Sequence, residues 1–392
     1  MHGLPAAKDY MLGYPINMNT PPEGFFEWKK QLSEVGLDRF AYNNVGNPKV
    51  HSHIPFNTHP MEREVIRHFG NVFHFPPDNA WGFLSHSGTD SNMHGMYYGR
   101  TILHGKTGLV PKAYFTKEAH YSMQILRDLL GMEWVEVGTL PDGAMDTADL
   151  ARCLADNPDH PALVCATTGT TFKGAVDSID AIGKVLGDRV AYLHVDAALF
   201  GGYLPHTEFA RELFQTVDGR HRYDSIAVSC HKFFGVASPA GLFVTTQRTF
   251  DDFLRLFSGV HDPEYILHVP GTITCSRDGV KPAEFLYHCK EEAVTQRIAD
   301  TQLILHNARY LYRQLKEHYP HLQPVLANEL SNTVYFRKPD DVLVNKYSLA
   351  TMKLQKEDRQ EAYAHIVVMP HATQPVLDHF LEDLAKADRS VA

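Results

Sequence analysis

The sequence predicts an α/β protein in which a mostly parallel sheet is covered by helices and followed by a smaller α+β unit. Short apolar segments typical of strands alternate with helix-like segments through the middle of the chain. This alternation is the pattern of a parallel sheet covered on both faces. Apolar residues then recur along one face of a long helix, from Ile298 through Leu305 to Tyr312, which is expected to link the sheet to the carboxyl-terminal unit.

Three regions are expected along the chain of 392 residues. Residues 1–60 are rich in proline, asparagine and histidine around one helical stretch at 24–35, and they are too irregular to fold alone. They are predicted to form an arm that lies over the rest of the protein. Residues 61–285 are predicted to form the large sheet domain, and residues 286–392 the small domain.

Each expected element has its own pattern. Met61, Val65, Phe69 and Phe73 recur at steps of four and predict an amphipathic helix. Further helices are expected among the strands at 91–100 and towards residue 130. The strands expected in the large domain are short and apolar, and they are 81–84, 112–116, 161–166, 191–196, 225–232 and 241–246. Strands at 330–336 and 365–369 and a closing helix at 373–384 are expected in the small domain.

Composition narrows the class of partner. Lysine and arginine number 37 against 46 aspartate and glutamate residues, and the net charge of −9 argues against a nucleic-acid or anionic-membrane partner. No apolar run approaches the roughly eighteen residues of a membrane span and no signal-peptide pattern is present, so a cytoplasmic protein is expected. Five cysteines without a CxxC pair and 24 scattered histidines predict neither disulfides nor a metal site. A small molecule remains as the expected partner.

An acid and an amine are the strongest chemical signal. Asp196 and Lys232 each close an apolar run, so both are expected at the carboxyl edge of the parallel sheet, where ligands of such sheets bind. A carboxylate and an ammonium are expensive to bury unless each has a charged partner. Pyridoxal 5′-phosphate would supply both partners, because Asp196 could hold its pyridinium nitrogen and Lys232 could form a Schiff base with its aldehyde.

The surrounding residues carry a resemblance to a known family. His194-Val-Asp-Ala-Ala198 and Ser229-Cys-His-Lys232 resemble the signature of the group II pyridoxal-phosphate amino-acid decarboxylases. The chain is most similar to bacterial histidine decarboxylases and plant serine decarboxylases, from Gly13-Tyr-Pro15 to Ala364-His-Ile-Val-Val-Met-Pro370. The resemblance implies a fold-type-I, aspartate aminotransferase-like sheet, and a homodimer in which the arm lies across the dimer interface.

The same resemblance implies a set of coenzyme-binding residues. The turn at 85–90 precedes a helix, whose first N–H groups suit a phosphate. Residues 87–92, Ser-Gly-Thr-Asp-Ser-Asn, resemble the family's phosphate cradle, with Ser87 and Ser91 in place of glycine. His120 would stack on the coenzyme ring, opposite the small Ala198, and Thr170 would support the Asp196 side. The full set implied is Ser87, Gly88, Thr89, His120, Thr170, Asp196, Ala198, Ser229, His231 and Lys232.

The expected reaction is α-decarboxylation of a free L-amino acid, with Lys232, His120 and Asp196 as catalytic residues. Tyr265 and His268 lie in the irregular segment 257–279, whose length is typical of a functional loop. They are candidates, beside Lys232, for the group that protonates Cα. A lyase or aminotransferase reaction on the same coenzyme, or a non-catalytic scaffold, would be the competing functions.

Histidine is the first choice of substrate, with Tyr14, Asn57 and Thr272 as candidate substrate-binding residues. Asn57 and the segment 272–274 resemble the bacterial histidine decarboxylases, whereas 12–17 and 330–336 are more similar to the serine enzymes. Serine or another small amino acid therefore stays open as the substrate.

Overall fold

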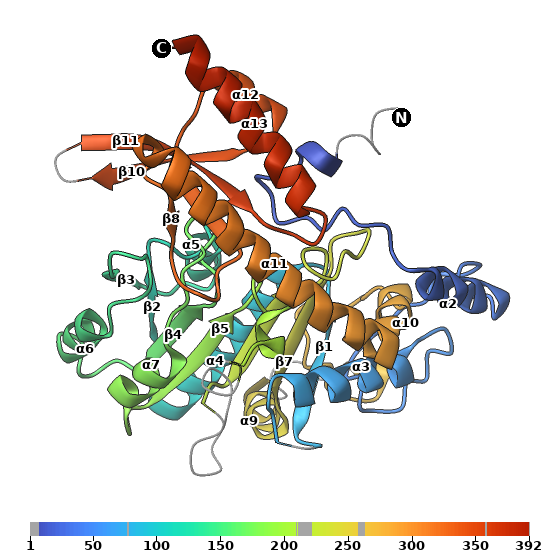
Figure 1. The fold of residues 1–392 in the computed structure, drawn as a ribbon. Coiled ribbons are helices and arrows are strands. Elements are labelled where there is room, and N and C mark those ends of the chain that lie inside the picture. Colours follow the sequence, from blue (N-terminus) through green and yellow to red (C-terminus); the bar gives the residue numbers. More distant parts are fainter. Residues whose placement is uncertain are drawn as a thin grey trace.

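The computed structural model describes residues 8–76, 78–208, 210, 222–257, 263–356 and 359–391. Two sheets organise the molecule, and the long helix α11 (Glu291–His318) passes from one to the other (Figure 1). No helix in these ranges is long and apolar enough to cross a membrane. Short 3-10 helices lie at Lys8–Tyr10 (η1), Leu204–His206 (η2), Glu264–Ile266 (η3), Leu286–Cys289 (η4) and Pro320–Leu322 (η5).

The larger sheet has seven strands in the order β1-β7-β6-β5-β4-β2-β3. Their bounds are Ala80–Ser85 (β1), Lys112–Thr116 (β2), Trp134–Val137 (β3), Ala162–Thr167 (β4), Ala191–Asp196 (β5), Ser225–Ser229 (β6) and Gly241–Thr246 (β7). Strand β7 runs antiparallel to both of its neighbours, while β6, β5, β4, β2 and β3 pair in parallel. The prediction of a mostly parallel sheet is confirmed. The segment between β6 and β7 is too short for a crossover helix, so β7 turns back.

Helices cover both faces of this sheet. They are α3 (His59–Val72), α4 (Gly88–Thr107), α5 (Ser122–Leu129), α6 (Thr147–Ala155), α7 (Ile179–Leu186), α9 (Gln247–Phe257) and α10 (Val280–Phe285). Successive strand residues point to opposite faces, so that Leu163 and Tyr192 join one buried cluster while Val164 and Leu193 join the other. Helix α4 lies on the first of these faces, across β5, β6 and β7. The carboxyl ends of the strands are left free for a ligand.

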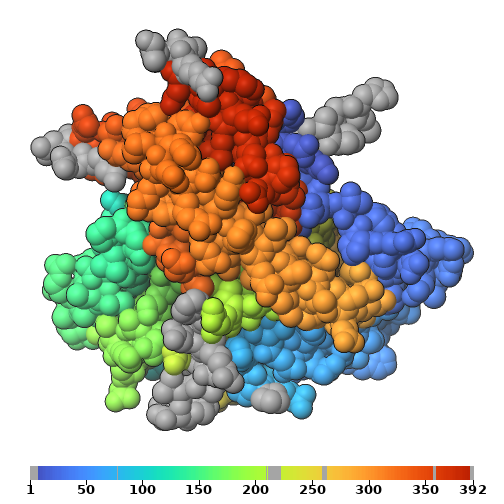
Figure 2. All heavy atoms as spheres, in the orientation of Figure 1, coloured from blue at the N-terminus to red at the C-terminus, as the bar shows by residue number. Residues whose placement is uncertain are grey.

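The smaller sheet is antiparallel, in the order β10-β11-β9-β8. Its strands are Val325–Leu326 (β8), Thr333–Arg337 (β9), Ala350–Lys356 (β10) and Arg359–Val367 (β11), and its helices are α12 (Asp341–Lys346) and α13 (Gln374–Val391). In Figure 2 this unit and α11 cover the large sheet domain from above. We propose domain boundaries near residues 60 and 285 on this arrangement.

The amino-terminal arm is held by both units. The N–H of Leu12 donates to the carbonyl of Tyr347 at 3.1 Å, and the N–H of Val367 donates to the carbonyl of Leu12 at 2.8 Å. Helix α2 (Glu23–Glu34) lies farther along the arm, where the indole N–H of Trp28 donates to the carbonyl of Ala283 at 2.8 Å. The arm therefore ties the beginning of the chain to its end.

The end of one strand was predicted wrongly, and the strands β3, β8 and β10 were not predicted. Strand β6 ends at Ser229, so Lys232 lies in the turn beyond the strand rather than at its end. The strand β10 was not predicted at all. It lies at the edge of the small sheet. Between residues 350 and 355, Leu354 is buried, Ala350 is half-buried and the remaining side chains are exposed. An edge strand with so little apolar pattern gives no clear periodicity.

Candidate active site

A cavity of about 410 Å³ opens at the carboxyl ends of β4, β5 and β6. This volume is within the usual range of small-molecule sites. Three parts of the chain form its walls: the loops of the large sheet, the arm at Gly13, Tyr14 and Pro15, and the small sheet at Ala350, Thr351, Met352 and His365. The position agrees with the rule that ligands of open α/β sheets bind at the strand ends.

Asp196 and Lys232 both line this cavity. Asp196 is the last residue of β5, and its Oδ1 accepts the N–H of Ala198 at 3.0 Å. Burial lowers the pKa of the Lys232 amine, and the nearby Asp196 carboxylate offsets part of that shift. A lysine with a lowered pKa is more often neutral, and the neutral amine is the form that can attack an aldehyde.

His120 lies beside this pair. Its Nδ1 accepts the main-chain N–H of Ser122 at 3.3 Å and is 2.8 Å from the Ser122 hydroxyl. Burial lowers the pKa of His120, with a smaller opposing effect from Asp196 and a further lowering by Lys232. The lowered pKa favours the neutral form of the imidazole. Because Nδ1 is an acceptor, the proton of this neutral ring is on Nε2.

The start of α4 also lines the cavity. Ser87 caps this helix, since its hydroxyl accepts the N–H of Asp90 at 3.2 Å. Gly88 and Thr89 follow in the first turn and line the cavity. A Cβ on Gly88 would lie 2.2 Å from the hydroxyl of Ser229, so that only glycine allows the helix to approach β6 this closely. The N–H groups of a first helical turn lack intrahelical acceptors and attract anions.

These groups fit pyridoxal 5′-phosphate. A helix start with free N–H groups, a buried carboxylate and a lysine of lowered pKa all line the cavity. Most of the predicted coenzyme residues meet here, together with one predicted substrate residue. Those that line the cavity are Tyr14, Ser87, Gly88, Thr89, His120, Asp196, Ala198, Ser229, His231 and Lys232.

Thr170 does not line the cavity. Its hydroxyl accepts the N–H of Ala175 at 2.9 Å and holds the loop after β4 in shape. Its neighbours Gly169 and Thr171 face the cavity instead. Gly169 has a φ of 96°, and this left-handed backbone turns the side chain of Thr170 inward.

Asn57, Thr272, Tyr265 and His268 also lie away from this cavity within the single chain. Asn57 lies two residues before α3 begins, where its Oδ1 accepts the N–H of His59 at 3.1 Å and its amide donates to the carbonyl of Ile54 at 2.7 Å. The Nε2 of His268 accepts the N–H of Asn47 at 3.1 Å. Asn57 and the Nε2 of His268 therefore have hydrogen-bond partners outside the coenzyme cavity.

Thr272 and Tyr265 line a second cavity of about 690 Å³, with apolar walls that include Met93, Tyr97 and Leu129. The segment after Gly271 is held along α4. The N–H of Ile273 donates to His94 at 2.9 Å, and the hydroxyl of Thr274 donates to Asp90 at 3.2 Å. The loop therefore follows the outer side of α4 and not the coenzyme cavity of its own chain.

Several lining residues were not predicted, among them Asn92, Phe172 and His365. The two ring nitrogens of His365 lie 2.9 Å from the carbonyl oxygen of Phe172 and 3.0 Å from that of Gly13, and its ring stacks on Phe172. Asn92 and His365 both lie inside the motifs quoted above, so a signal for them was present. Met352, on the edge strand β10, had none.

Comparisons with known proteins agree with this site. The pyridoxal-dependent decarboxylase conserved domain matches residues 54–250. Serine decarboxylase 1 of Oryza sativa subsp. japonica is 33% identical over 96% of this chain and 72% of that protein. Histidine decarboxylase of Solanum lycopersicum is 31% identical over 97% of this chain and 86% of that protein. Among solved structures, L-methionine decarboxylase from Streptomyces sp. 590 has a TM-score of 0.84 at 23% identity, covering 98% and 92% of the two chains, and this likeness shows the fold.

The fold and the cavity define a fold-type-I enzyme with an aspartate at the end of one strand and a lysine in the turn beyond the next strand. The chain belongs to the pyridoxal-dependent decarboxylase family. It is a pyridoxal-phosphate-dependent amino-acid decarboxylase, and its cofactor is pyridoxal 5′-phosphate.

Proposed function

We propose that this decarboxylase converts L-histidine to histamine and carbon dioxide. Pyridoxal 5′-phosphate supplies an electron sink for the charge that carbon dioxide leaves behind. Lys232 holds the coenzyme, Asp196 keeps its ring nitrogen charged, and the first turn of α4 binds its phosphate. His120 orients the ring by contact, with its proton fixed on Nε2 through Ser122.

The observation that supports a ring-bearing substrate is the composition of the rest of the cavity wall. Tyr14, Phe172 and Met352 form part of it. Flat aromatic side chains and a polarisable thioether suit an imidazole better than a short hydroxymethyl group. Histidine decarboxylase of Vibrio anguillarum, 29% identical over 94% of this chain and 90% of that protein, supports the same choice.

Serine is the second candidate. Serine decarboxylase 1 of Oryza sativa is the relative with 33% identity. Tyr14, which lies in the segment most similar to the serine enzymes, lines the cavity, whereas Asn57 and Thr272 do not line it within one chain. In a serine decarboxylase, the hydroxyl of the substrate would occupy the place that the imidazole of the substrate occupies in a histidine decarboxylase.

A substrate competition tests the proposal. Carbon dioxide and amine would be measured for L-histidine and L-serine separately and then together, with the other amino acids as single substrates. We expect kcat/KM for histidine to exceed that for serine by a factor of about 100, as is typical of pockets that distinguish substrates by apolar contacts. A higher value for serine would overturn the substrate, and formation of a keto acid in place of carbon dioxide would indicate transamination.

We also propose that the active unit is a homodimer. Tyr121, the cap residue of α5, and Ile125 and Leu129 within the helix recur at steps of four. All three are exposed, although Met123 and Leu126 of α5 are buried. A helix with apolar residues on both sides is normally covered on both sides. Tyr265 and Leu267 are exposed as well, and Tyr265 shares the second cavity with Leu129.

A dimer would also give Tyr265 and His268 a role. Within one chain neither residue lines the coenzyme cavity. If the two-fold axis passes near α5, the segment 263–275 of one chain lies at the mouth of the other chain's site. Tyr265 and His268 are then the proposed donors of the proton to Cα.

A further inference from the structure

A third cavity, of about 340 Å³, lies between the arm, the turn after Lys232 and the start of α11. Residues of all three segments form its wall, among them Asn17, Phe25, Phe234, Gln296, Arg297 and Asp300. In Figure 2 the arm, in dark blue, borders the start of α11, in orange. This cavity shares none of its lining residues with the coenzyme cavity.

Arg297 is the unusual residue of this cavity. It is only 4% exposed. Its Nε donates to Nε2 of His206 at 3.3 Å and its Nη1 donates to the carbonyl of His288 at 2.6 Å, but its Nη2 is buried without a hydrogen-bond partner. The guanidinium carbon lies 5.6 Å from the ring centres of both Phe69 and Phe234.

Within the described ranges, Arg297 forms no ion pair with a carboxylate. Burial lowers the pKa of Arg297 to about 10, so the side chain is still charged at neutral pH. Its nearest titratable neighbours do not balance that charge. Burial, and next Arg297 itself, lower the pKa of His68 and His206 to about 4 and that of His288 to about 3.

A buried charge that has no partner of opposite charge destabilises a folded protein. Asp300, one helical turn beyond Arg297, lines the same cavity but accepts the amide of Gln296 at 2.9 Å. It does not contact the guanidinium in the described structure. The geometry therefore leaves a cation beside an open cavity.

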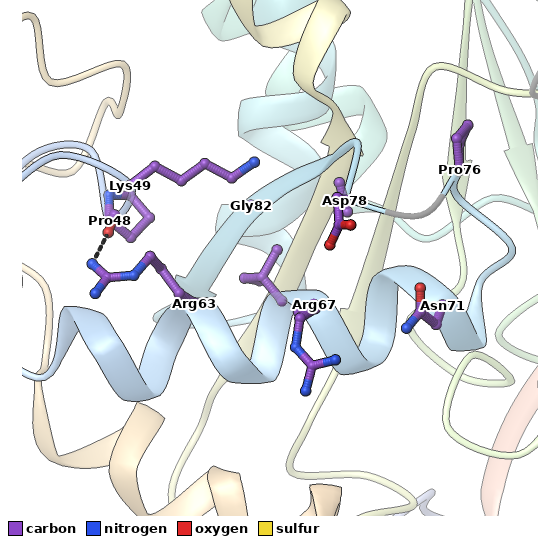
Figure 3. A pocket seen from close by; sticks show the side chains of 10 residues that line it. Pro48, Lys49, Arg63, Arg67, Asn71, Pro76, Asp78 and Gly82 are labelled. Carbon is purple, nitrogen blue, oxygen red and sulfur yellow. Dashed lines mark hydrogen bonds between the residues drawn. The ribbon is translucent and has the colours of Figure 1, made fainter.

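A second basic cavity shows the contrast. It measures about 310 Å³ and lies between α3 and β1, with Lys49, Arg63 and Arg67 in its wall (Figure 3). Each of these cations has a partner: Lys49 donates to Gln247 at 2.7 Å, Arg63 donates to the carbonyl of Pro48 at 2.8 Å, and Arg67 pairs with Glu64. Their side chains are also exposed, so they need no bound anion.

We propose that the cavity at Arg297 binds a small organic monocarboxylate, whose carboxylate pairs with the guanidinium. One buried positive charge matches one negative charge, and the carboxylate of Asp300 on the same wall disfavours a dianion such as phosphate. Phe25 and Phe234 supply an apolar wall for the body of the ligand. The volume is near the lower end for small-molecule pockets, about 300 Å³, and is larger than a halide needs.

The site is linked to the active-site lysine through the arm. The N–H of Asn17 donates to the carbonyl of Lys232 at 3.3 Å, and its side-chain amide donates to the carbonyl of Phe233 at 2.9 Å. Asn17 and Phe233 both line the Arg297 cavity. A ligand there contacts the turn that carries Lys232 without entering the coenzyme site.

Benzoate is a suitable probe, with benzamide as its neutral isostere. Binding to the full-length holoenzyme would be measured by calorimetry and by thermal unfolding at constant ionic strength. We expect saturable binding of benzoate, a rise in Tm with its concentration, and no effect of benzamide. Arg297→Met should weaken binding on the order of 10- to 100-fold, since a hydrogen bond to a charged group is lost.

Two control variants are measured beside Arg297→Met. Arg309→Met removes a charge from the same helix at an exposed site, where Arg309 contacts Glu329 at 3.3 Å, and it should leave benzoate binding unchanged. Lys232→Ala should also retain binding, because the ligand is outside the coenzyme cavity. Binding that survives in Arg297→Met, or that disappears in Lys232→Ala, would place benzoate elsewhere and overturn the proposal. Binding of chloride or phosphate without benzoate would overturn the class of ligand.

Discussion

Lys232 has to satisfy two conditions in one place. Its amine must be neutral to react with the coenzyme aldehyde, and burial lowers its pKa in that direction. Its charge must also be tolerated when it is protonated, and the Asp196 carboxylate nearby provides for that. Burial and the Asp196 carboxylate therefore shift the pKa of Lys232 in opposite directions, and neither shift cancels the other completely.

Lys232→Ala is expected to abolish covalent attachment of the coenzyme. Reduction with borohydride followed by mass spectrometry should find a modified peptide at Lys232 in the native protein and none in the variant. Lys184→Ala, at an exposed lysine paired with Asp180, is the matched control and should keep the adduct. A modified peptide elsewhere in the Lys232 variant would show that another lysine holds the coenzyme.

Asp196→Ala is expected to lower kcat on the order of 100-fold or more, even with saturating coenzyme. The reason is electrostatic, because a buried carboxylate stabilises the positive ring nitrogen that makes the coenzyme an electron sink. Single-turnover kinetics at saturating pyridoxal phosphate separates this loss from weaker coenzyme binding. Turnover near that of the native enzyme would refute the assigned role.

Buried histidines are expected to make the fold sensitive to acid. Burial lowers the pKa of five of them from 6.5 to about 4 or about 3, and they are His59, His68, His194, His206 and His288. Each binds its proton mainly after unfolding. The stability present above pH 6.5 is therefore lost as the pH falls from about 6.5 towards 4, by about 1.4 kcal/mol per pH unit for a fully shifted group.

Asp177 and Asp224 act in the opposite direction, since burial raises their pKa to about 6. Their protonation in the folded state stabilises it below that pH, but the histidines outnumber them. Urea unfolding at several pH values should show that the free energy of unfolding decreases as the pH is lowered. His288→Gln should reduce the slope of that free energy against pH. An unchanged slope in this variant would mean that His288 is protonated in the folded protein.

Residues whose role depends on local sequence could be predicted, and those placed by tertiary structure could not. Asp196 and Lys232 follow apolar runs, so their position at the sheet edge follows from the pattern of the strands. Thr170 was assigned to the cavity, but the positive φ of Gly169 directs it inward, and a single sequence does not report that angle. Tyr265 and His268 depend on the path of a long loop, which no periodicity describes.

At the scale of elements, one buried ion pair joins segments distant in sequence. Arg277 pairs with Glu62 of α3, and both are almost fully buried. Arg277 also donates to the carbonyl of Gly46 at 3.0 Å, while Glu62 accepts the N–H of Leu84 on β1 at 3.0 Å. The arm, α3, β1 and the long loop all meet at this pair.

Arg277→Met is therefore expected to reduce the free energy of unfolding by about 3 to 5 kcal/mol, because it leaves Glu62 buried without its partner. Chemical denaturation at neutral pH would measure the loss. The double variant Arg277→Met with Glu62→Gln removes the uncompensated charge and should recover part of the stability. If the double variant were as unstable as the single one, the loss would come from packing rather than charge.

Elements were predicted best where the apolar pattern was strongest. The strands β2, β5 and β7 have the predicted bounds, because each is a compact apolar run buried on both faces. The strand β10 was missed because most of its side chains are polar or exposed. Because β10 was missed, the contribution of Met352 to the cavity wall was not predicted either.

At the scale of the whole molecule, we predict that the protein is a dimer at micromolar concentration. The exposed apolar residues of α5 would be buried in the interface, so Ile125→Asp should favour the monomer. Val342→Asp changes an equally apolar and exposed residue on α12 and is the control. Sedimentation velocity measures both, and an active monomer of the native chain would contradict the proposal.

The hydrogen bond between His365 and Gly13 also bears on how the protein is made. These residues are 352 positions apart, and the neighbouring contact of Leu12 with Val367 spans a similar distance. During synthesis the start of the chain leaves the ribosome long before its partner exists. The large sheet can fold in that interval, but the cavity gains its last wall only when β11 has emerged. Coenzyme loading should therefore be a late, post-translational event, and a chain truncated before β11 should fold its first sheet and yet retain the coenzyme poorly.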